Sequence, residues 1–376
     1  MRQDASENAG DGRCLVYAHG NDWDGVRSRQ RYLMEALSRY IPVIYLDGSW
    51  DKRGLVTQHQ VSERITVVRG LLRPMVSLKL RGLEQPSHLW GWWHTRWIRR
   101  KYSRIIFMDS ENWLRPYRFI PHDSLVFDCI DPCFDRSPQV LADFEKRELE
   151  VLHASQAVFV TADSLLEFAR EHNKNVTLLN NACSPVEYAP DLVAAAKEPE
   201  WWPKEARQVA AYMGAIDWRF DFDIAVQAAR DHPNIHFVFA GNVLGEVIDR
   251  SLELHELPNV CMPGRVTVED GRYLLSHCDI GLIPFKMGEM NDAINPVKMY
   301  AYAFLGKPIA GSAVSELVSR PAIAVTGDTP PAFSRAVTLA LERSRDAAEA
   351  GKLKEFAAKN TWENRAAEAW KVLEKL

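Results

Sequence analysis

Short apolar runs alternate with amphipathic segments along most of the chain. In the first half, apolar runs predict β-strands at 14–20, 43–48, 104–110, 124–131, 157–163 and 176–182. Between the first two, Ser28–Tyr40 has apolar side chains at helical spacing and predicts an amphipathic helix. Because continuous apolar strands separated by helices are buried on both faces, this half predicts a parallel sheet with helices on each side.

The alternation is interrupted over 184–205, which is rich in Pro and Glu, and then resumes. Further strands are predicted at 209–217, 236–241, 260–264, 279–285 and 307–312, with a helix at 222–232. The predicted fold class is α/β, with two Rossmann-like, doubly wound parallel sheets facing a ligand cleft at the carboxyl ends of their strands. The expected division is a first domain at 1–190, a linker at 191–207, a second domain at 208–360 and a terminal helix at 361–376 that crosses back to the first domain.

Composition and charge narrow the class of protein. The 376 residues are 47% hydrophobic and 26% charged, with a net charge of -4, so the whole chain lacks the basic bias of a nucleic-acid-binding protein. The polar N-terminus has no signal-peptide apolar region, and no apolar run has the length of a membrane span. The six cysteines lack zinc-site spacing and are interpreted as reduced thiols, which favours a cytoplasmic location.

The segment NPVKMYAYAFLGKPIAG (295–311) combines a core-like helix with a lysine in its first turn. Asn295 is expected to cap this helix, with Pro296 in the first turn. Unpaired amides at a helix N-terminus attract anions, so Lys298 is unfavourable there unless a negative group binds nearby. A diphosphate would resolve this conflict. The alternative is a solvated lysine on the surface of a core helix.

Several stretches of the second half resemble the C-terminal domain of GT-B glycosyltransferases, in the order found in that family. They are YMGAIDWRFDFDIAVQAARDHPNIHFVFAG, LPNVCMPGRVTVEDGRYLLSHCDIGLIPF, NPVKMYAYAFLGKPIAG and NTWENRAAEAW, over most of Tyr212–Trp370. More narrowly, the chain resembles bacterial exopolysaccharide and teichuronic-acid-type transferases and the glucuronosyltransferase of xanthan assembly. The first half is similar more loosely, through LVFDCIDPCFD and EKRELEVLHASQAVFVTADSLLEFA.

This resemblance implies a nucleotide-sugar site in the second domain and an acceptor site in the first. In the family, the lysine of Asn-Pro-x-Lys binds the donor phosphates, and Lys298 occupies that position. A glutamate that binds the donor ribose commonly follows three residues later, where this chain has Ala301. The xanthan-type enzyme also lacks this glutamate. The substitution therefore leaves catalysis open, together with the mode of ribose recognition and the choice between inversion and retention.

Other candidates for donor binding follow strand ends of the second domain. Gly214 would let a ligand approach the backbone closely, although it also fits an ordinary strand-to-loop glycine. Arg219 has the planar fork that clamps a phosphate. The resemblance places Arg265 and Val266 in the loop that contacts the nucleobase. The full set of donor-binding candidates is Gly214, Arg219, Arg265, Val266, Asn295, Lys298 and Tyr302.

Transfer of a sugar to a hydroxyl requires a base, and the first half offers several candidates. Asp128 and Asp131 lie three residues apart at a strand end, so only one is expected to face substrate. The catalytic aspartate of the xanthan-type enzyme aligns with Asp131, whose alternative role is to cap the turn before Pro132. His19 is a second catalytic candidate, in the loop after the first strand. Three further candidates are Asp22, for the acceptor, and the weaker Asp109 and Glu111.

The segment 73–104 is rich in Arg, Lys and Trp and contains one acidic residue, Glu84. Basic residues beside exposed tryptophans suit the surface of an anionic bilayer, where a lipid-linked acceptor would be reached. A core helix with inward tryptophans and solvated arginines is the alternative, and single-stranded nucleic acid is a third reading that the net charge disfavours. The candidate residues for acceptor or membrane contact in this segment are Trp92, Trp93, Trp97, Arg99 and Arg100.

The leading functional prediction is a metal-independent hexosyl- or glycuronosyltransferase of bacterial cell-surface polysaccharide synthesis. It would use a nucleotide-diphosphate sugar, with a UDP-sugar favoured, and a glycan or polyprenyl-linked acceptor, without a cofactor. The expected location is cytoplasmic, with peripheral contact at the inner face of the plasma membrane and no nucleic-acid partner. The alternatives are a catalytically altered nucleotide-sugar- or glycan-binding relative and a GT-B-like sugar-nucleotide epimerase.

Overall fold

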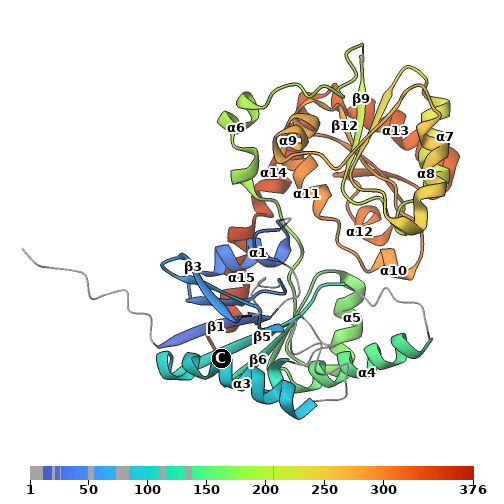
Figure 1. Ribbon diagram of the computed structural model, residues 1–376. Helices are drawn as coiled ribbons and strands as arrows, with labels where there is room; N and C mark the ends of the chain where they lie inside the picture. Colours follow the sequence, from blue (N-terminus) through green and yellow to red (C-terminus); the bar gives the residue numbers. More distant parts are fainter. Residues whose placement is uncertain are drawn as a thin grey trace, which may run out of the picture. The chain divides into compact units, whose positions relative to one another are not determined.

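The computed structural model describes residues 12–18, 22–25, 27–49, 55–72, 84–110, 116–131, 138–205 and 207–376 (Figure 1). The chain divides into two compact units. The first unit contains Met1–Asn180 and Trp362–Leu376, and the second contains Asn181–Thr361. The polypeptide therefore passes from one unit to the other twice, after Asn180 and after Thr361.

The first unit contains an eight-stranded sheet with the order β3-β4-β2-β1-β5-β6-β7-β8. Its strands are β1 (Arg13–Ala18), β2 (Val43–Leu46), β3 (Thr57–Ser62), β4 (Ile65–Arg69), β5 (Arg104–Asp109), β6 (Ser124–Cys129), β7 (Ala157–Val160) and β8 (Val176–Leu178). β3 pairs antiparallel with β4, and all other neighbours are parallel. Every side chain of β2, β6 and β7 is buried, as expected for strands covered on both faces.

Five α-helices and a short 3-10 helix are described in the first unit. They are α1 (Arg29–Leu37), α3 (Glu84–Lys101), η1 (Pro116–Arg118), α4 (Pro138–Ala154), α5 (Asp163–His172) and α15 (Trp362–Leu373). The last helix returns from the end of the chain and packs on α1, where Tyr32 stacks on Trp362 and Tyr40 stacks on Trp370. Aromatic pairs of this kind add favourable contact beyond the buried area, so they help hold α15 on the first unit.

The second unit contains a six-stranded, wholly parallel sheet with the order β11-β10-β9-β12-β13-β14. Its strands are β9 (Val209–Met213), β10 (His236–Ala240), β11 (Val260–Gly264), β12 (Ile280–Ile283), β13 (Ile309–Ser312) and β14 (Ala324–Gly327). Its helices are η2 (Pro185–Tyr188), α6 (Pro190–Ala195), α7 (Phe222–Asp231), η3 (Gly245–Val247), α8 (Ile248–His255), α9 (Val268–His277), α10 (Glu289–Asp292), α11 (Val297–Phe304), α12 (Ser315–Val318), α13 (Pro330–Ser344) and α14 (Ala347–Lys359).

The prediction of two Rossmann-like parallel-sheet units is confirmed, and each apolar run that predicted a strand contains one. The periodicity missed the hairpin of β3 and β4 and the short strand β14. The reason differs between them. β3 is a polar edge strand, TQHQVS, whose side chains are almost all exposed, so its pairing with β4 leaves no hydrophobic alternation. β14 has four residues, AVTG, too few to form a recognisable pattern.

Candidate functional site

Two glycines at the carboxyl ends of β9 and β10 allow the chain segments there to approach each other closely. Gly214 and Gly241 have φ angles of 149° and 153°, which L-residues with a side chain rarely adopt. A Cβ at Gly241 would lie 1.8 Å from the carbonyl oxygen of Gly214, so a side chain would push the two loops apart. A Cβ at Gly214 would lie 3.3 Å from Nζ of Lys298. Gly214 therefore leaves space for the Lys298 ammonium.

Lys298, in the first turn of α11, has an aromatic environment and no anionic partner among the described residues. Its Nζ lies 4.6 Å from the ring centroid of Tyr212 and 4.7 Å from that of Phe285. Within the described part of the chain, no carboxylate forms an ion pair with it. Two ring faces stabilise an ammonium by cation–π attraction but leave its charge available to an anion. The first-turn amides of α11 add positive potential at the same end.

Burial and a second cation weaken the charged form of Lys298. Removal from water, together with the positive charge of Arg219 and opposed by the negative charge of Asp217, lowers the pKa of Lys298 from 10.5 to about 7. Lys298 as a residue keeps partial solvent exposure, although its amine is desolvated. An anion bound beside the ammonium would favour the protonated form, as an opposite charge does at short distance.

Arg219 is the second cation of this region, and Asp217 orients it. Nε of Arg219 donates to both carboxylate oxygens of Asp217, at 2.9 and 3.0 Å, and Nη2 also pairs with that carboxylate. Asp217 is buried, whereas the Arg219 side chain keeps 29% of its surface exposed. The loop is fixed further by the Lys286 amide, which donates to the Arg219 carbonyl at 2.7 Å. The guanidinium is thus held in a defined orientation with part of its surface open to a ligand.

Arg265 and Val266 follow β11, as the sequence predicted. Arg265 is exposed, and no described residue forms an ion pair with it. Val266 is partly buried and packs against the core of the second unit. The preceding Gly264 has a φ of 74° and accepts a hydrogen bond from the Gly241 amide at 2.8 Å, so β10 and β11 end side by side. The loops after β9, β10 and β11 therefore all start at the same end of the sheet, the carboxyl ends of its strands.

The prediction that Asn295 caps α11 is wrong. Pro296 is the N-cap residue, and no side chain caps the helix. Asn295 is instead buried, and its Oδ1 accepts hydrogen bonds from the Asn181 amide at 2.9 Å and the Tyr300 hydroxyl at 3.0 Å. Its Nδ2 donates to the buried Glu316. These two hydrogen bonds occupy both lone pairs of the Asn295 Oδ1. Asn295 therefore holds α11 in place, and its side-chain oxygen is not available to a nucleotide sugar.

Tyr302 also lies in the core of the second unit, away from any ligand surface. It is fully buried, and its hydroxyl donates to the carbonyl of Ala211 at 2.9 Å, with a longer contact of 3.4 Å to that of Leu282. Its ring fills the space over Gly281. Direct donor binding by Tyr302 is therefore unsupported. Ala301, where the family has a glutamate, is partly buried and packs on the same core.

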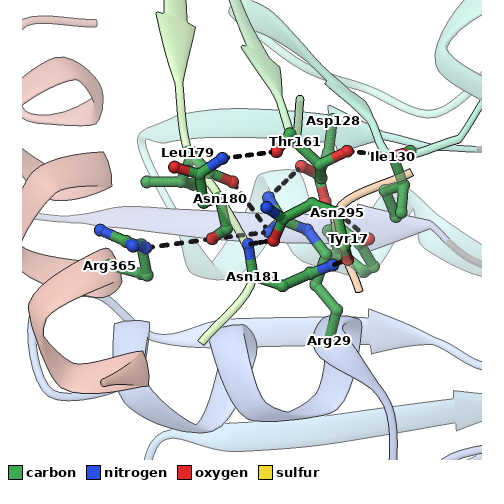
Figure 2. A network of polar contacts seen from close by, with 10 residues as sticks. All are labelled: Tyr17, Arg29, Asp128, Ile130, Thr161, Leu179, Asn180, Asn181, Asn295 and Arg365. Atoms are coloured by element: carbon green, nitrogen blue, oxygen red, sulfur yellow. Dashed lines mark hydrogen bonds and ion pairs between the residues drawn. The ribbon is translucent and has the colours of Figure 1, made fainter. Parts of the chain in front are cut away.

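In the first unit, Asp128 is enclosed by its own protein partners (Figure 2). Arg29 of α1 forms an ion pair with its Oδ1 at 3.0 Å, and the Tyr17 hydroxyl donates to its Oδ2 at 3.2 Å. Nη1 of Arg29 also donates to the carbonyls of Leu179 and Asn180, at 2.9 and 3.2 Å. The Asp128–Arg29 pair thus connects α1, β6 and the chain just before it leaves the first unit, and its role is structural.

Asp131 differs from Asp128 because it lies beyond the end of β6 and is partly exposed. The sequence predicted that only one of the two aspartates faces substrate, and Asp131 is the one with solvent access. Behind it, the Cys129 thiol donates to Oε1 of Glu148 on α4 at 3.4 Å. Burial raises the pKa of Glu148 to about 7, so this carboxyl is largely protonated below neutral pH.

The remaining first-unit candidates are only partly described. His19 and Glu111 lie outside the described residues. Asp22 is exposed, and its Oδ1 accepts from the Asp24 amide at 3.0 Å, which closes a local turn. Asp109 is fully buried at the end of β5. Among the described residues, the structure identifies no ligand surface that Asp22 or Asp109 shares with Asp131.

The predicted aromatic and basic surface lies on α3. Trp92 and Trp93 are exposed, at 47% and 54%, and both line a hollow of about 600 Å³ together with Arg96, Arg99, Arg100 and Pro121. Trp97 is only partly exposed, and its indole nitrogen is buried, with no hydrogen-bond partner in the described structure. Trp97 thus packs more like a core residue. The basic residues Arg73, Lys79 and Arg81 lie outside the described residues.

Sequence reasoning missed three residues that shape these sites: Tyr212, Phe285 and Arg29. The first two supply the aromatic faces around Lys298 and come from β9 and the loop after β12, far apart in the sequence. Arg29 begins an amphipathic helix, and only its burial distinguishes it from a solvated arginine. No local pattern reports such contacts, because they arise from the order of strands in the sheet.

Among the described residues, no group of three or more His, Cys, Asp or Glu could hold a metal ion. In the same part of the chain, no helix combines the length and the apolarity needed to cross a bilayer.

Comparison with known proteins gives a curated sequence relative and many structural ones. The chain is 26% identical over 244 residues to a protein of Bacillus subtilis (strain 168) provisionally assigned as the teichuronic acid biosynthesis glycosyltransferase TuaH. This match covers 60% of the chain and 60% of the relative, so it spans less than two thirds of that protein's length. No protein-family model matches the chain.

Two solved structures illustrate the structural similarity. Sucrose-phosphate synthase from Thermosynechococcus elongatus has a TM-score of 0.75 and 16% identity, with 96% of this chain and 98% of that chain covered. HepE from Anabaena, in complex with UDP and glucose, has a TM-score of 0.67 and 12% identity, with 97% and 100% covered. At these identities the similarity concerns the fold. The chain therefore has the two-domain, Rossmann-like GT-B fold, and the resemblance to teichuronic-acid-type glycosyltransferases that its sequence motifs indicated is confirmed.

Proposed function

We propose that this protein is a glycosyltransferase that transfers a sugar from a nucleotide-diphosphate sugar to a hydroxyl of a glycan or lipid-linked acceptor. The observation that carries the proposal is the Lys298 ammonium, which lies between two aromatic rings beside Gly214 and has no carboxylate partner among the described residues. A diphosphate supplies the missing negative charge. Arg219, held by Asp217, lies close enough to lower the pKa of Lys298 and is the natural second contact.

The proposed chemistry divides between the two units. In the second unit, Lys298, Arg219 and the first-turn amides of α11 stabilise the negative charge that develops on the leaving diphosphate. In the first unit, Asp131 accepts the proton of the acceptor hydroxyl, since it is the solvent-accessible aspartate at the end of β6. The proposed reaction needs no bound metal ion, because these cations and amides take the charge of the diphosphate.

The relatives favour particular substrates. The Bacillus subtilis relative is named for teichuronic acid biosynthesis, and HepE was solved with UDP and glucose. We therefore propose a UDP-hexose or UDP-glycuronic acid as donor and a role in cell-surface polysaccharide synthesis. The acceptor would be a growing glycan or its lipid-linked form at the inner face of the plasma membrane.

Calorimetric titration with UDP tests the donor site. Replacing Lys298 with Met should weaken UDP binding by about 10- to 100-fold, since hydrogen bonds to charged groups contribute about 1.5–3 kcal/mol. Lys307→Met is the matched control. Lys307 is also partly buried in the second unit, but it precedes β13 and so lies at the amino ends of the strands, opposite the proposed site. Equal affinities of the wild type and Lys298→Met would refute the phosphate assignment.

A second function is motivated by Ala301, which cannot accept hydrogen bonds from a ribose as the family glutamate does. Under this alternative, the protein binds a nucleotide sugar or glycan but does not transfer the sugar. Release of UDP from UDP-glucose, UDP-galactose and UDP-glucuronate, measured with and without added glycan acceptors, distinguishes the two. UDP binding without turnover of any donor would support the binding protein.

A further inference from the structure

One face of α3 presents aromatic and basic side chains to solvent in a continuous stripe. The exposed positions follow helical spacing, so they lie on the same side of the helix. They are Leu89, Trp92, Trp93 and Arg100, and the partly exposed Arg96 lies on the same side. Leu89 is 63% exposed, more than either tryptophan. An amphipathic helix of a soluble domain normally turns its polar side outward, and this helix exposes large apolar groups instead.

The opposite face of α3 is fixed to the first unit. Gly91, Thr95 and Ile98 on this face are buried, and α3 contacts β5. His88 stacks on Phe119, with ring centroids 4.7 Å apart. Because this face is held by packing, the helix cannot rotate to bury its tryptophans without losing core contacts. In this packing the stripe lies on the surface of the first unit.

The charge of the stripe is positive and largely uncompensated. Arg96 and Arg100 of the stripe have no ion pair within the described ranges, whereas the neighbouring Arg99 pairs with Asp123 at 2.6 Å. The hollow formed by Trp92, Trp93, Arg96, Arg99, Arg100 and Pro121 brings apolar walls and guanidinium groups together. A ligand for this surface must combine negative charge with an apolar part.

We propose that α3 is an interfacial helix that docks the first unit on an anionic phospholipid bilayer. Tryptophan and leucine side chains insert at the boundary between headgroups and acyl chains, and the arginines contact lipid phosphates. This docking is independent of the donor site, because every residue in it belongs to the first unit and Lys298 belongs to the second.

Nucleic acid fits the same surface less well. Bases stack on open aromatic faces, but the guanidinium of Arg96 lies 3.5 Å from the ring centroid of Trp93 and covers one of its faces. Trp92 and Trp93 are tilted by 54° and do not form a parallel stacking platform. Exposed Leu89 offers nothing to a base, whereas it contributes to insertion in a bilayer.

Cosedimentation of the full chain with vesicles tests the proposal. The wild type should bind vesicles of phosphatidylcholine with about one third phosphatidylglycerol, and bind vesicles of phosphatidylcholine alone much less. Arg96→Gln with Arg100→Gln should lower the partition coefficient on anionic vesicles roughly thirtyfold. Trp92→Ser with Trp93→Ser should lower binding to the same vesicles and reduce the salt-resistant fraction. The control is Arg335→Gln with Arg345→Gln, two exposed arginines of the second unit.

Three outcomes would overturn the proposal. They are failure of the wild type to bind anionic vesicles, equal binding by the wild type and both α3 variants, and equal loss in the control variant. Binding of a fluorescent single-stranded RNA that is lost in the α3 variants, without vesicle binding, would assign the surface to nucleic acid instead. UDP titration of each variant separates this test from the proposed function, since the α3 variants should retain wild-type UDP affinity.

Discussion

Both units enclose charged side chains near the carboxyl ends of their central strands, but they compensate these charges differently. In the first unit, Asp128 and Arg29 retain 0% and 3% of their side-chain surface and neutralise each other at 3.0 Å. In the second unit, Lys298 lies over two aromatic faces and forms no ion pair with a described carboxylate, since Asp217 acts on it only from beyond ion-pair distance. The first charge is neutralised by a direct partner within the protein, whereas the second has no direct anionic partner among the described residues.

This difference separates a structural charge from a candidate binding charge. A buried ion pair whose partners are all internal has no capacity left for a ligand, and its removal should affect folding. A cation held by ring faces, with a lowered pKa, is destabilised in the free protein and gains most from an anionic ligand. The same comparison applies to Asp128 and Asp131, of which only Asp131 has solvent access.

The largest expected effect concerns the two aspartates. Asp131→Asn should lower turnover of the preferred UDP-sugar by 10²- to 10⁴-fold, the usual contribution of a general base, while UDP affinity stays unchanged. Initial-rate assays and UDP titration measure the two quantities separately. Full activity of this variant would remove Asp131 as the base and leave the difference between the aspartates without functional meaning.

The next effect concerns the stability of the first unit. Arg29→Met leaves the carboxylate of Asp128 buried without its cation, which should lower the free energy of unfolding by about 3–5 kcal/mol. Urea denaturation followed by circular dichroism measures this loss. A change below 1 kcal/mol would show that the pair is not the main compensation of Asp128.

The double variant Arg29→Met with Asp128→Asn is the control for this effect. It removes both charges, so most of the lost stability should return even though the hydrogen bonds to Leu179 and Asn180 are still missing. If the double variant is as unstable as the single variant, those hydrogen bonds, and not the ion pair, hold the region together.

A pH-dependent effect on stability tests Lys298. Its pKa is about 7 in the folded protein and 10.5 when unperturbed, so between these pH values the unfolded chain binds more protons. The free energy of unfolding should therefore rise with pH in this window, by at most about 1.4 kcal/mol per pH unit, and the contribution should be flat below pH 7. Lys298→Met should lack this slope. Subtracting the unfolding free energy of the variant from that of the wild type at each pH cancels the contributions of all other titrating groups.

The same shift predicts proton uptake when UDP binds. At pH 8 the free Lys298 amine is mostly neutral, and a diphosphate beside it favours protonation, so the complex should take up a fraction of a proton. Calorimetry in buffers of different ionisation enthalpy measures this fraction. Lys298→Arg should bind UDP without uptake. Identical uptake in the two proteins would assign the proton to another group.

The smallest expected effect on UDP affinity concerns Arg265, an exposed cation that contrasts with the desolvated Lys298. Arg265 is exposed and unpaired among the described residues, so water and salt screen its charge. Arg265→Gln should weaken UDP binding by no more than about fivefold, in line with exposed charge pairs, and the difference should disappear in 0.5 M salt. A loss as large as that of Lys298→Met would show that Arg265 contacts the phosphates directly.

The fold was predictable because strands and helices leave local signals. Continuous apolar runs such as those of β1 and β9 are buried on both faces, and their repetition predicts a parallel sheet. Lys298 and Gly214 could be named as candidates for a related reason, since a lysine at a helix start and a glycine at a strand end are locally unusual. The edge strand β3 left no such signal, because its stability comes from pairing with β4.

The sequence by itself determined two α/β units, the lysine in the first turn of α11 and the two aspartates at the end of β6. Only the tertiary structure decided which charges are compensated. It brought Tyr212 and Phe285 to Lys298, Arg29 to Asp128, and the Asn295 side chain to Asn181 in place of the helix cap. The physical reason is that compensation of a charge depends on contacts between residues distant in the chain, whereas periodicity reports only contacts within one element.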